Sequence, residues 1–300
     1  MAMLGFSQKK QADLGAMWRT GVVAIFGLVG GGWFGWQVTG YWGYSAETTL
    51  KILLSALVCL AFALLVFFGS IAIERSVCRI APARFSSFVR LFDRRAASEP
   101  CGLAILRGTF LGLALLGVDT FLVWLGTNGL GMRLDVIRHI TGLGGLLSTP
   151  WPSAGVVLIA LFHTLMIGSL VPFLASSVAR FVRRSWLAVF LAAAPAAASA
   201  TIITLGAVQP YHWKILLLLF DCLVLVWAFH RFDVLTVAWA GFTFAFCWQN
   251  YFLLVMLEPT GAVEQWIAFV IWGLFVAAAG VVAFQSSLRA ARRRVAAAFE

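Results

Sequence analysis

Long apolar segments constrain this chain more than any other feature of its sequence. Eight of them can be marked along the 300 residues, and each is close to the roughly 20 apolar residues that a helix needs to cross a bilayer. The segments are residues 20–38, 50–73, 108–126, 154–176, 186–206, 211–229, 234–256 and 263–284. Because a spanning segment must satisfy its own backbone polar groups, we expect an all-α, polytopic membrane helix bundle of about eight transmembrane helices.

The composition agrees with a membrane protein. Hydrophobic residues make up 62% of the chain and charged residues only 11%, whereas soluble domains carry about 25% charged residues. The net charge of +10 comes from basic residues clustered beside the apolar segments. Orientation in the bilayer and attraction to anionic lipids explain such clusters, so we expect the lipid bilayer and anionic lipids as partners and no nucleic acid.

The basic residues also predict which way the bundle is oriented. If the N-terminus is cytoplasmic, 18 of the 22 Lys and Arg residues lie on the cytoplasmic side, as the positive-inside rule requires. We therefore expect both termini inside, with a cytoplasmic segment 1–19, a bundle over 20–284 and a basic cytoplasmic tail 285–300, in the cytoplasmic membrane of a bacterium. Only residues 230–233 separate the sixth and seventh segments, which predicts a tight helical hairpin.

Two connections are long enough to hold structure of their own. The cytoplasmic connection 74–107 mixes apolar residues with arginines, a pattern typical of an interfacial amphipathic helix that binds lipid or a protein partner. The alternative is a basic loop that only fixes the topology. The candidate lipid or partner surface consists of Arg75, Arg79, Arg84, Arg90, Arg94 and Arg95. The outer connection 127–153 predicts a short helical stretch near Met132 to Ile140.

Polar residues inside the apolar segments are the candidate functional site, because ionisable groups are costly in a bilayer and face a bundle interior or a cavity. The candidates are Asp119, His163, Lys214, Asp221, Gln249 and Asn250. Most of them fall in the outer half of the membrane, which predicts a polar pocket or packing network there. Structural pairing between helices, a ligand or ion site and a proton relay are the alternatives. A haem-ligand role for His163 is a further one, although a single intramembrane histidine is more often a packing residue.

Small residues dominate the fifth segment, around Pro195, and recur in the first segment as Gly27, Gly30, Gly31 and Gly32. Small residues allow helices to approach closely. We expect them to form internal helix contacts, with a dimer interface as the alternative.

Catalytic signatures are missing from the sequence. It holds no HExxH, no GxSxG and no GxxxxGK[ST] motif, and its five cysteines form no CxxC pair. The sequence therefore predicts a protein that is not an enzyme, with no catalytic residues, no metal site and no cofactor.

Part of the chain resembles the membrane region that follows the catalytic domain in some bacterial Hanks-type serine/threonine protein kinases. The run FGSIAIERSVCRIAPARFSSFVRLFDRR and the following ILRGTFLGLALLGV carry the resemblance. The matching positions are Ile73, Glu74, Arg75, Arg79, Ser87, Arg90 and Leu91. The later run from Trp186 to the SSLRAARRR tail is similar in hydropathy and order. The kinase domain is absent, so the resemblance implies a sensing or anchoring part without kinase activity.

Two functions follow as hypotheses. In the first, the chain is a non-catalytic integral membrane protein that acts as a sensory or signalling module, an anchor for a protein partner, or a subunit of a larger membrane complex. In the second, it is a small-solute or ion carrier with a polar pocket in the outer half of the membrane. The absence of a convincing internal repeat favours the first.

Overall fold

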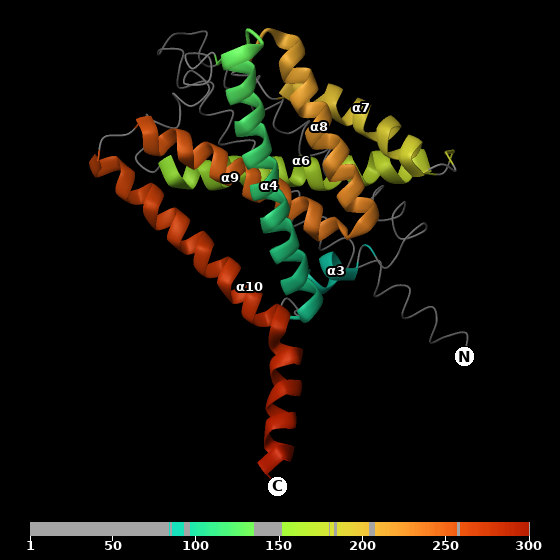
Figure 1. Ribbon diagram of the computed structural model, residues 1–300, viewed down its shortest axis with the longest axis vertical. Helices are drawn as coiled ribbons and strands as arrows, with labels where there is room; N and C mark the ends of the chain where they lie inside the picture. Colours follow the sequence, from blue (N-terminus) through green and yellow to red (C-terminus); the bar gives the residue numbers. More distant parts are fainter. Residues whose placement is uncertain are drawn as a thin grey trace, which may run out of the picture.

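The computed structural model describes residues 84, 86–92, 97–134, 152–179, 181–182, 185–203, 208–256 and 259–299. Helices form almost all of this part of the chain (Figure 1). They are α3 (Ser86–Phe92), α4 (Glu99–Gly129), α6 (Pro152–Ala179), α7 (Ser185–Ile203), α8 (Tyr211–Arg231), α9 (Val234–Met256) and α10 (Pro259–Phe299). Two short strands, β1 (Arg133–Leu134) and β2 (Val208–Gln209), pair antiparallel.

The helices coincide with six of the eight predicted segments, from the third to the eighth. Three of the described helices are long and apolar enough to cross a membrane, namely α4, residues His212–Arg231 of α8 and residues Val263–Gln285 of α10. The helical class and the membrane character are confirmed. The first two segments, 20–38 and 50–73, lie outside the described residues together with Gly27 to Gly32, so the count of eight stays a prediction.

The division between α8 and α9 confirms the predicted hairpin, because α8 ends at Arg231 and α9 begins at Val234. The start of α4 differs from expectation. The helix begins at Glu99, nine residues before the predicted segment, with Pro100 in its first turn, a position where proline costs no hydrogen bond. The last part of the connection 74–107 is therefore the first turns of a spanning helix.

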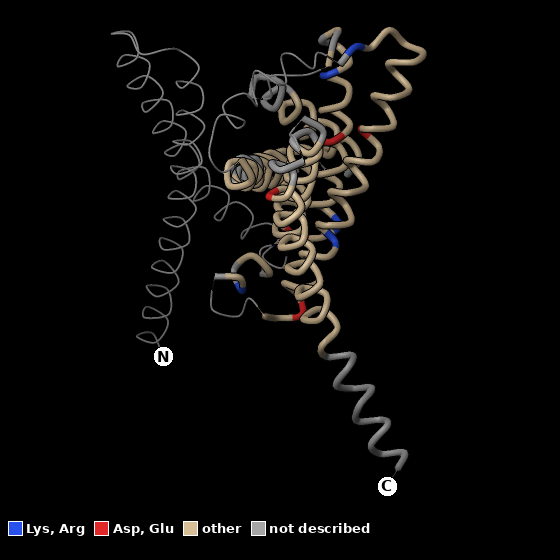
Figure 2. Tube along the Cα trace, turned by 90° about the vertical axis from the view of Figure 1, so that its left-hand side faces the viewer, with Lys and Arg blue, Asp and Glu red and all other residues tan. Residues whose placement is uncertain are grey.

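Two sets of contacts define two ends of the bundle. At one end, which we call the ladder end, Arg133 of β1 pairs with Gln209 of β2. The predicted helical stretch from Met132 is wrong at its first positions, because pairing with β2 gives Arg133 and Leu134 a strand partner; residues 135–140 lie outside the described part. At the other end, the α3 end, α3 contacts α4 and α9. Lys and Arg positions lie mainly towards the two ends (Figure 2).

Glycines let α4 pack closely on its neighbours. A Cβ at Gly112 would lie 2.5 Å from the backbone oxygen of Ala240 in α9, and one at Gly108 would lie 2.7 Å from that of Thr236. A Cβ at Gly102 would meet Ala279 in α10 at 2.6 Å. Gly108 meets Thr236 and Gly112 meets Ala240, so residue numbers rise together along α4 and α9 and the two helices run in the same direction. The helices can approach this closely because glycine has no side chain.

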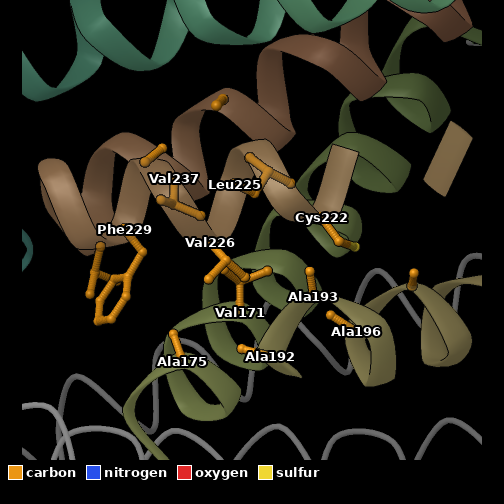
Figure 3. Packing of buried hydrophobic residues seen from close by; sticks show 14 of the residues in the cluster. Val171, Ala175, Ala192, Ala193, Ala196, Cys222, Leu225, Val226, Phe229 and Val237 are labelled. Carbon is orange, nitrogen blue, oxygen red and sulfur yellow. The ribbon is translucent and has the colours of Figure 1, made fainter. Parts of the chain in front are cut away.

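The largest apolar cluster lies between α6, α7, α8 and α9 (Figure 3). Alanines of α7 form one side of it, and Ala192, Ala193 and Ala196 are at most 1% exposed. Val171 of α6 and Val226 of α8 pack against this side. The small residues of the fifth segment therefore make internal helix contacts, as predicted.

Candidate functional site

Two of the predicted intramembrane residues meet between α4 and α8. The carboxyl groups of Asp119 and Asp221 lie within hydrogen-bonding reach of each other, and the two residues are 7% and 9% exposed. We call them the carboxyl pair. An ionised carboxylate only accepts hydrogen bonds, so a bond between these two groups requires a proton on one of them.

The surroundings of the carboxyl pair offer little other stabilisation within the described part of the chain. Oδ1 of Asp119 and Oδ1 of Asp221 receive no hydrogen bond from the N–H and O–H groups of the described residues. Leaving a buried acceptor unsatisfied costs about 1–3 kcal/mol. The pair therefore lies in an environment that favours either the shared proton or a cation between the two groups.

Lys214 is the buried cation of the same helix. It is 6% exposed and precedes Asp221 by seven residues, which is close to two helical turns, so the two side chains leave α8 on the same side. Lys214 follows β2 closely and lies towards the ladder end, while Asp221 lies at mid-helix.

The structure does not add the remaining predicted residues to the carboxyl pair. Asn250 is fully buried and donates from Nδ2 to the backbone oxygen of Phe246 in its own helix at 3.1 Å. Gln249 is half-buried on α9. His163 lies on α6, but its side chain is outside the described part.

Polar contacts that sequence reasoning missed link α6 with α10 near the N-terminal ends of both helices. Ser153 Oγ lies 3.3 Å from Glu264 Oε2 and 3.4 Å from Gln265 Oε1, and Gln265 is fully buried. The sequence could have indicated this contact, because Gln265 is a polar residue inside the eighth predicted segment. A second missed bond joins α9 to α4, where Trp239 Nε1 donates to Thr109 Oγ1 at 2.9 Å.

A second cluster forms at the α3 end. Ser87 of α3 is buried and donates its hydroxyl to Asp233 Oδ2 at 2.8 Å. The other carboxylate oxygen, Oδ1, accepts the backbone N–H of Thr236 at 2.7 Å, so Asp233 caps the N-terminus of α9. The carboxylate of Asp233 thus caps the N-terminus of α9 and also binds α3 through Ser87.

Arg84 makes the second link of this cluster. Its Nη1 donates to His230 Nδ1 at 3.2 Å, and its guanidinium lies 5.6 Å from the centre of the Phe229 ring. Arginine is donor only, so Nδ1 of His230 must accept and the imidazole must be neutral with its proton on Nε2. Partial burial lowers the pKa of the Arg84 guanidinium from its ordinary value, although arginine stays charged at physiological pH. Arg84, Ser87, His230 and Asp233 form what we call the docking cluster.

Apolar packing and one thiol hydrogen bond also hold α3 against the bundle. Cys101 of α4 is fully buried and donates its S–H to the backbone oxygen of Ser87 at 3.2 Å. Phe88 and Leu91 of α3 pack against a small cluster that contains Cys101 and Leu235. Helix α3 is therefore seated on the ends of α4 and α9.

The structure describes two of the six arginines that were predicted to form a lipid or partner surface. Arg84 contacts the bundle, as described above, and Arg90 is exposed on α3. The other four lie outside the described residues: Arg75, Arg79, Arg94 and Arg95. Their binding role stays a prediction.

Comparison with known proteins gives no relative: no family model matches the chain, and no curated protein or solved structure is significantly similar to it. The resemblance to the membrane region of Hanks-type kinases therefore stays a prediction.

Proposed function

We propose that the chain is a non-catalytic, multi-pass module of the bacterial cytoplasmic membrane that senses a signal, anchors a protein partner or serves as a subunit of a larger complex. In this proposal eight helices span the membrane, both termini are cytoplasmic, and the arginines of residues 74–107 present a surface to anionic lipid or to the partner. The resemblance to kinase membrane regions favours the same class.

The docking cluster carries this proposal. Arg84 and Ser87 belong to the arginine-rich connection, and they bond to His230 and Asp233, which lie 146 residues further along the chain in each case. A partner that binds the arginines is thereby coupled to the α8–α9 hairpin, and a change among the helices can reach the partner by the same contacts.

Two long-range contacts support the predicted topology. The pairing of β1 with β2 joins two connections that are both predicted to be outside. The bond of Ser87 to Asp233 joins two that are both predicted to be cytoplasmic. Segments on opposite faces of a bilayer cannot form such contacts, so both agree with the predicted sides.

Affinity purification from native membranes in mild detergent tests the proposal. Replacing Arg75, Arg79, Arg90, Arg94 and Arg95 by Gln leaves the docked Arg84 in place. We expect this variant to lose the protein partner, or the anionic lipid, that the wild-type chain retains. Arg133→Gln, at the ladder end, is the control and should retain it. An unchanged set of co-purifying molecules in the five-arginine variant contradicts the proposal.

A second function, an ion or small-solute carrier, is favoured by the carboxyl pair, because a buried carboxyl that exchanges a proton is a common feature of ion pathways. Flux of H⁺ or Na⁺ into proteoliposomes, measured with a fluorescent indicator, tests it. Asp221→Asn should abolish the flux and Arg133→Gln should leave it intact. A flux that Asp221→Asn leaves unchanged removes the carrier hypothesis.

A further inference from the structure

We propose that His230 is an acid-sensitive latch: protonation of its imidazole releases Arg84, and with it the α3 segment, from the end of the bundle. The release is a property of the docking cluster itself. Its consequence, a change in the surface offered to a partner, rests on the proposed function.

The hydrogen bond between Arg84 and His230 sets the direction of the effect. Arg84 Nη1 donates to Nδ1 at 3.2 Å, and Nδ1 can accept only while it carries no proton. Protonation would place an N–H of the imidazolium against an N–H of the guanidinium, with two positive charges in contact. The docked form therefore binds one proton fewer than the released form, and by linkage docking is favoured as the pH rises and lost as it falls.

The charges around His230 offer the imidazolium no replacement partner within the described part of the chain. Arg84, Arg231 and Arg107 are positive, and Arg107 reaches this end through its contact with the ring of Phe232. Asp233 is the negative group, and both of its oxygens already accept hydrogen bonds, from Ser87 and from the N–H of Thr236.

The native thiol of Cys101 can report the release of α3, so no cysteine has to be introduced for the assay. Its thiol is fully buried and bonded to the backbone of Ser87, so a reagent cannot reach it while α3 stays in contact with α4 and α9. Alkylation by N-ethylmaleimide, with the modified cysteine identified by mass spectrometry of the intact purified chain, measures the fraction released. Dividing each rate by that of the denatured chain at the same pH removes the titration of the thiol itself.

We expect normalised labelling of Cys101 to rise about tenfold between pH 8 and pH 5, the range in which histidine titrates and other ordinary side chains do not, since a hydrogen bond to a charged group corresponds to a factor of about that size. His230→Asn keeps an acceptor near the position of Nδ1 and cannot titrate, so its labelling should stay low at both pH values. His230→Lys carries a permanent charge and should already label at pH 8 as the wild type does at pH 5. Arg133→Gln, at the ladder end and away from the docking cluster, should behave as the wild type.

Labelling that does not rise on acidification in the wild type overturns the proposal. An equal rise in His230→Asn also overturns it, because another group would then be responsible. If His230→Asn does not fold, Arg84→Ala supplies the test: its labelling should be high at pH 8 with no further rise at pH 5, and a retained acid response contradicts the latch. The assay contains no partner. A positive result with unchanged co-purification would therefore reject the proposed function and leave the latch intact.

Discussion

The carboxyl pair, which is buried, and the docking cluster, which is partly buried, are both polar contacts between distant segments, but they are built in opposite ways. In the docking cluster each acceptor meets a donor, as Asp233 does with Ser87 and Thr236. In the carboxyl pair two acids lie within hydrogen-bonding reach of each other, and a bond between them needs a proton that neither group holds permanently. The docking cluster is therefore stabilised by its own hydrogen bonds, whereas the carboxyl pair is held in place by helix packing, above all the close contact of α4 with α9.

The largest effect should come from breaking that packing. Gly112→Ala places a methyl group 2.5 Å from the backbone oxygen of Ala240, which cannot move without shifting α9. Overpacking of this kind costs about 1–3 kcal/mol, measured by denaturation in detergent micelles. Gly117→Ala is the control in the same helix, because a Cβ there meets nothing within 4 Å. Equal stability of the two variants would contradict the tight α4–α9 contact.

The carboxyl pair itself should respond to the choice of substitution. Asp221→Ala removes one member and leaves Asp119 buried without its partner, at a cost of about 1–3 kcal/mol. Asp221→Asn supplies a permanent N–H donor to Asp119 and should be tolerated better. The stability of the wild type should fall as the pH rises, because the shared proton is lost, and that of Asp221→Asn should not follow it. Thermal unfolding at several pH values measures both, and parallel pH curves would show that no proton is shared.

The docking cluster should lose a cap and a link together when Asp233 is changed. Asp233→Ala removes the acceptor of Ser87 Oγ and of the Thr236 N–H, and loss of an N-cap costs about 0.5–2 kcal/mol. Asp233→Asn keeps one side-chain oxygen and should lose less. Chemical denaturation gives the cost, and an Asp233→Ala variant as stable as the wild type would exclude the cap.

The smallest effect is expected at the bond between Trp239 and Thr109. Trp239→Phe keeps an aromatic ring and removes the N–H donor, and interhelical hydrogen bonds in membranes average about 0.6 kcal/mol. Thr109→Val should give a similar loss, and the double variant should lose no more than the larger single one. Additive losses in a double-mutant cycle would mean that the two side chains do not bond.

The sequence predicted the helices well and their mutual contacts poorly. Apolar length located the segments from 108 to 284, and a four-residue interruption was enough to place the hairpin before Val234. Hydropathy does not state how a helix is rotated about its axis, so it could not show that Asp119 faces Asp221. Ser87 gave no signal either, because a small polar residue among arginines reads as solvent-exposed, whereas the structure buries it. The glycine pattern of α4, Gly108 followed by Gly112, was a usable signal for close packing.

The seating of α3 on the α8–α9 hairpin is the central claim, and a disulfide tests it most directly. In a chain whose native cysteines are replaced by Ala, Ser87→Cys and Asp233→Cys should cross-link readily under mild oxidation, because the native side-chain oxygens lie 2.8 Å apart. The pair Arg90→Cys and Asp233→Cys is the control, since Arg90 is exposed on the same helix. The account predicts rapid cross-linking of the first pair and little of the second. Equal yields, or none from the first pair, would contradict it.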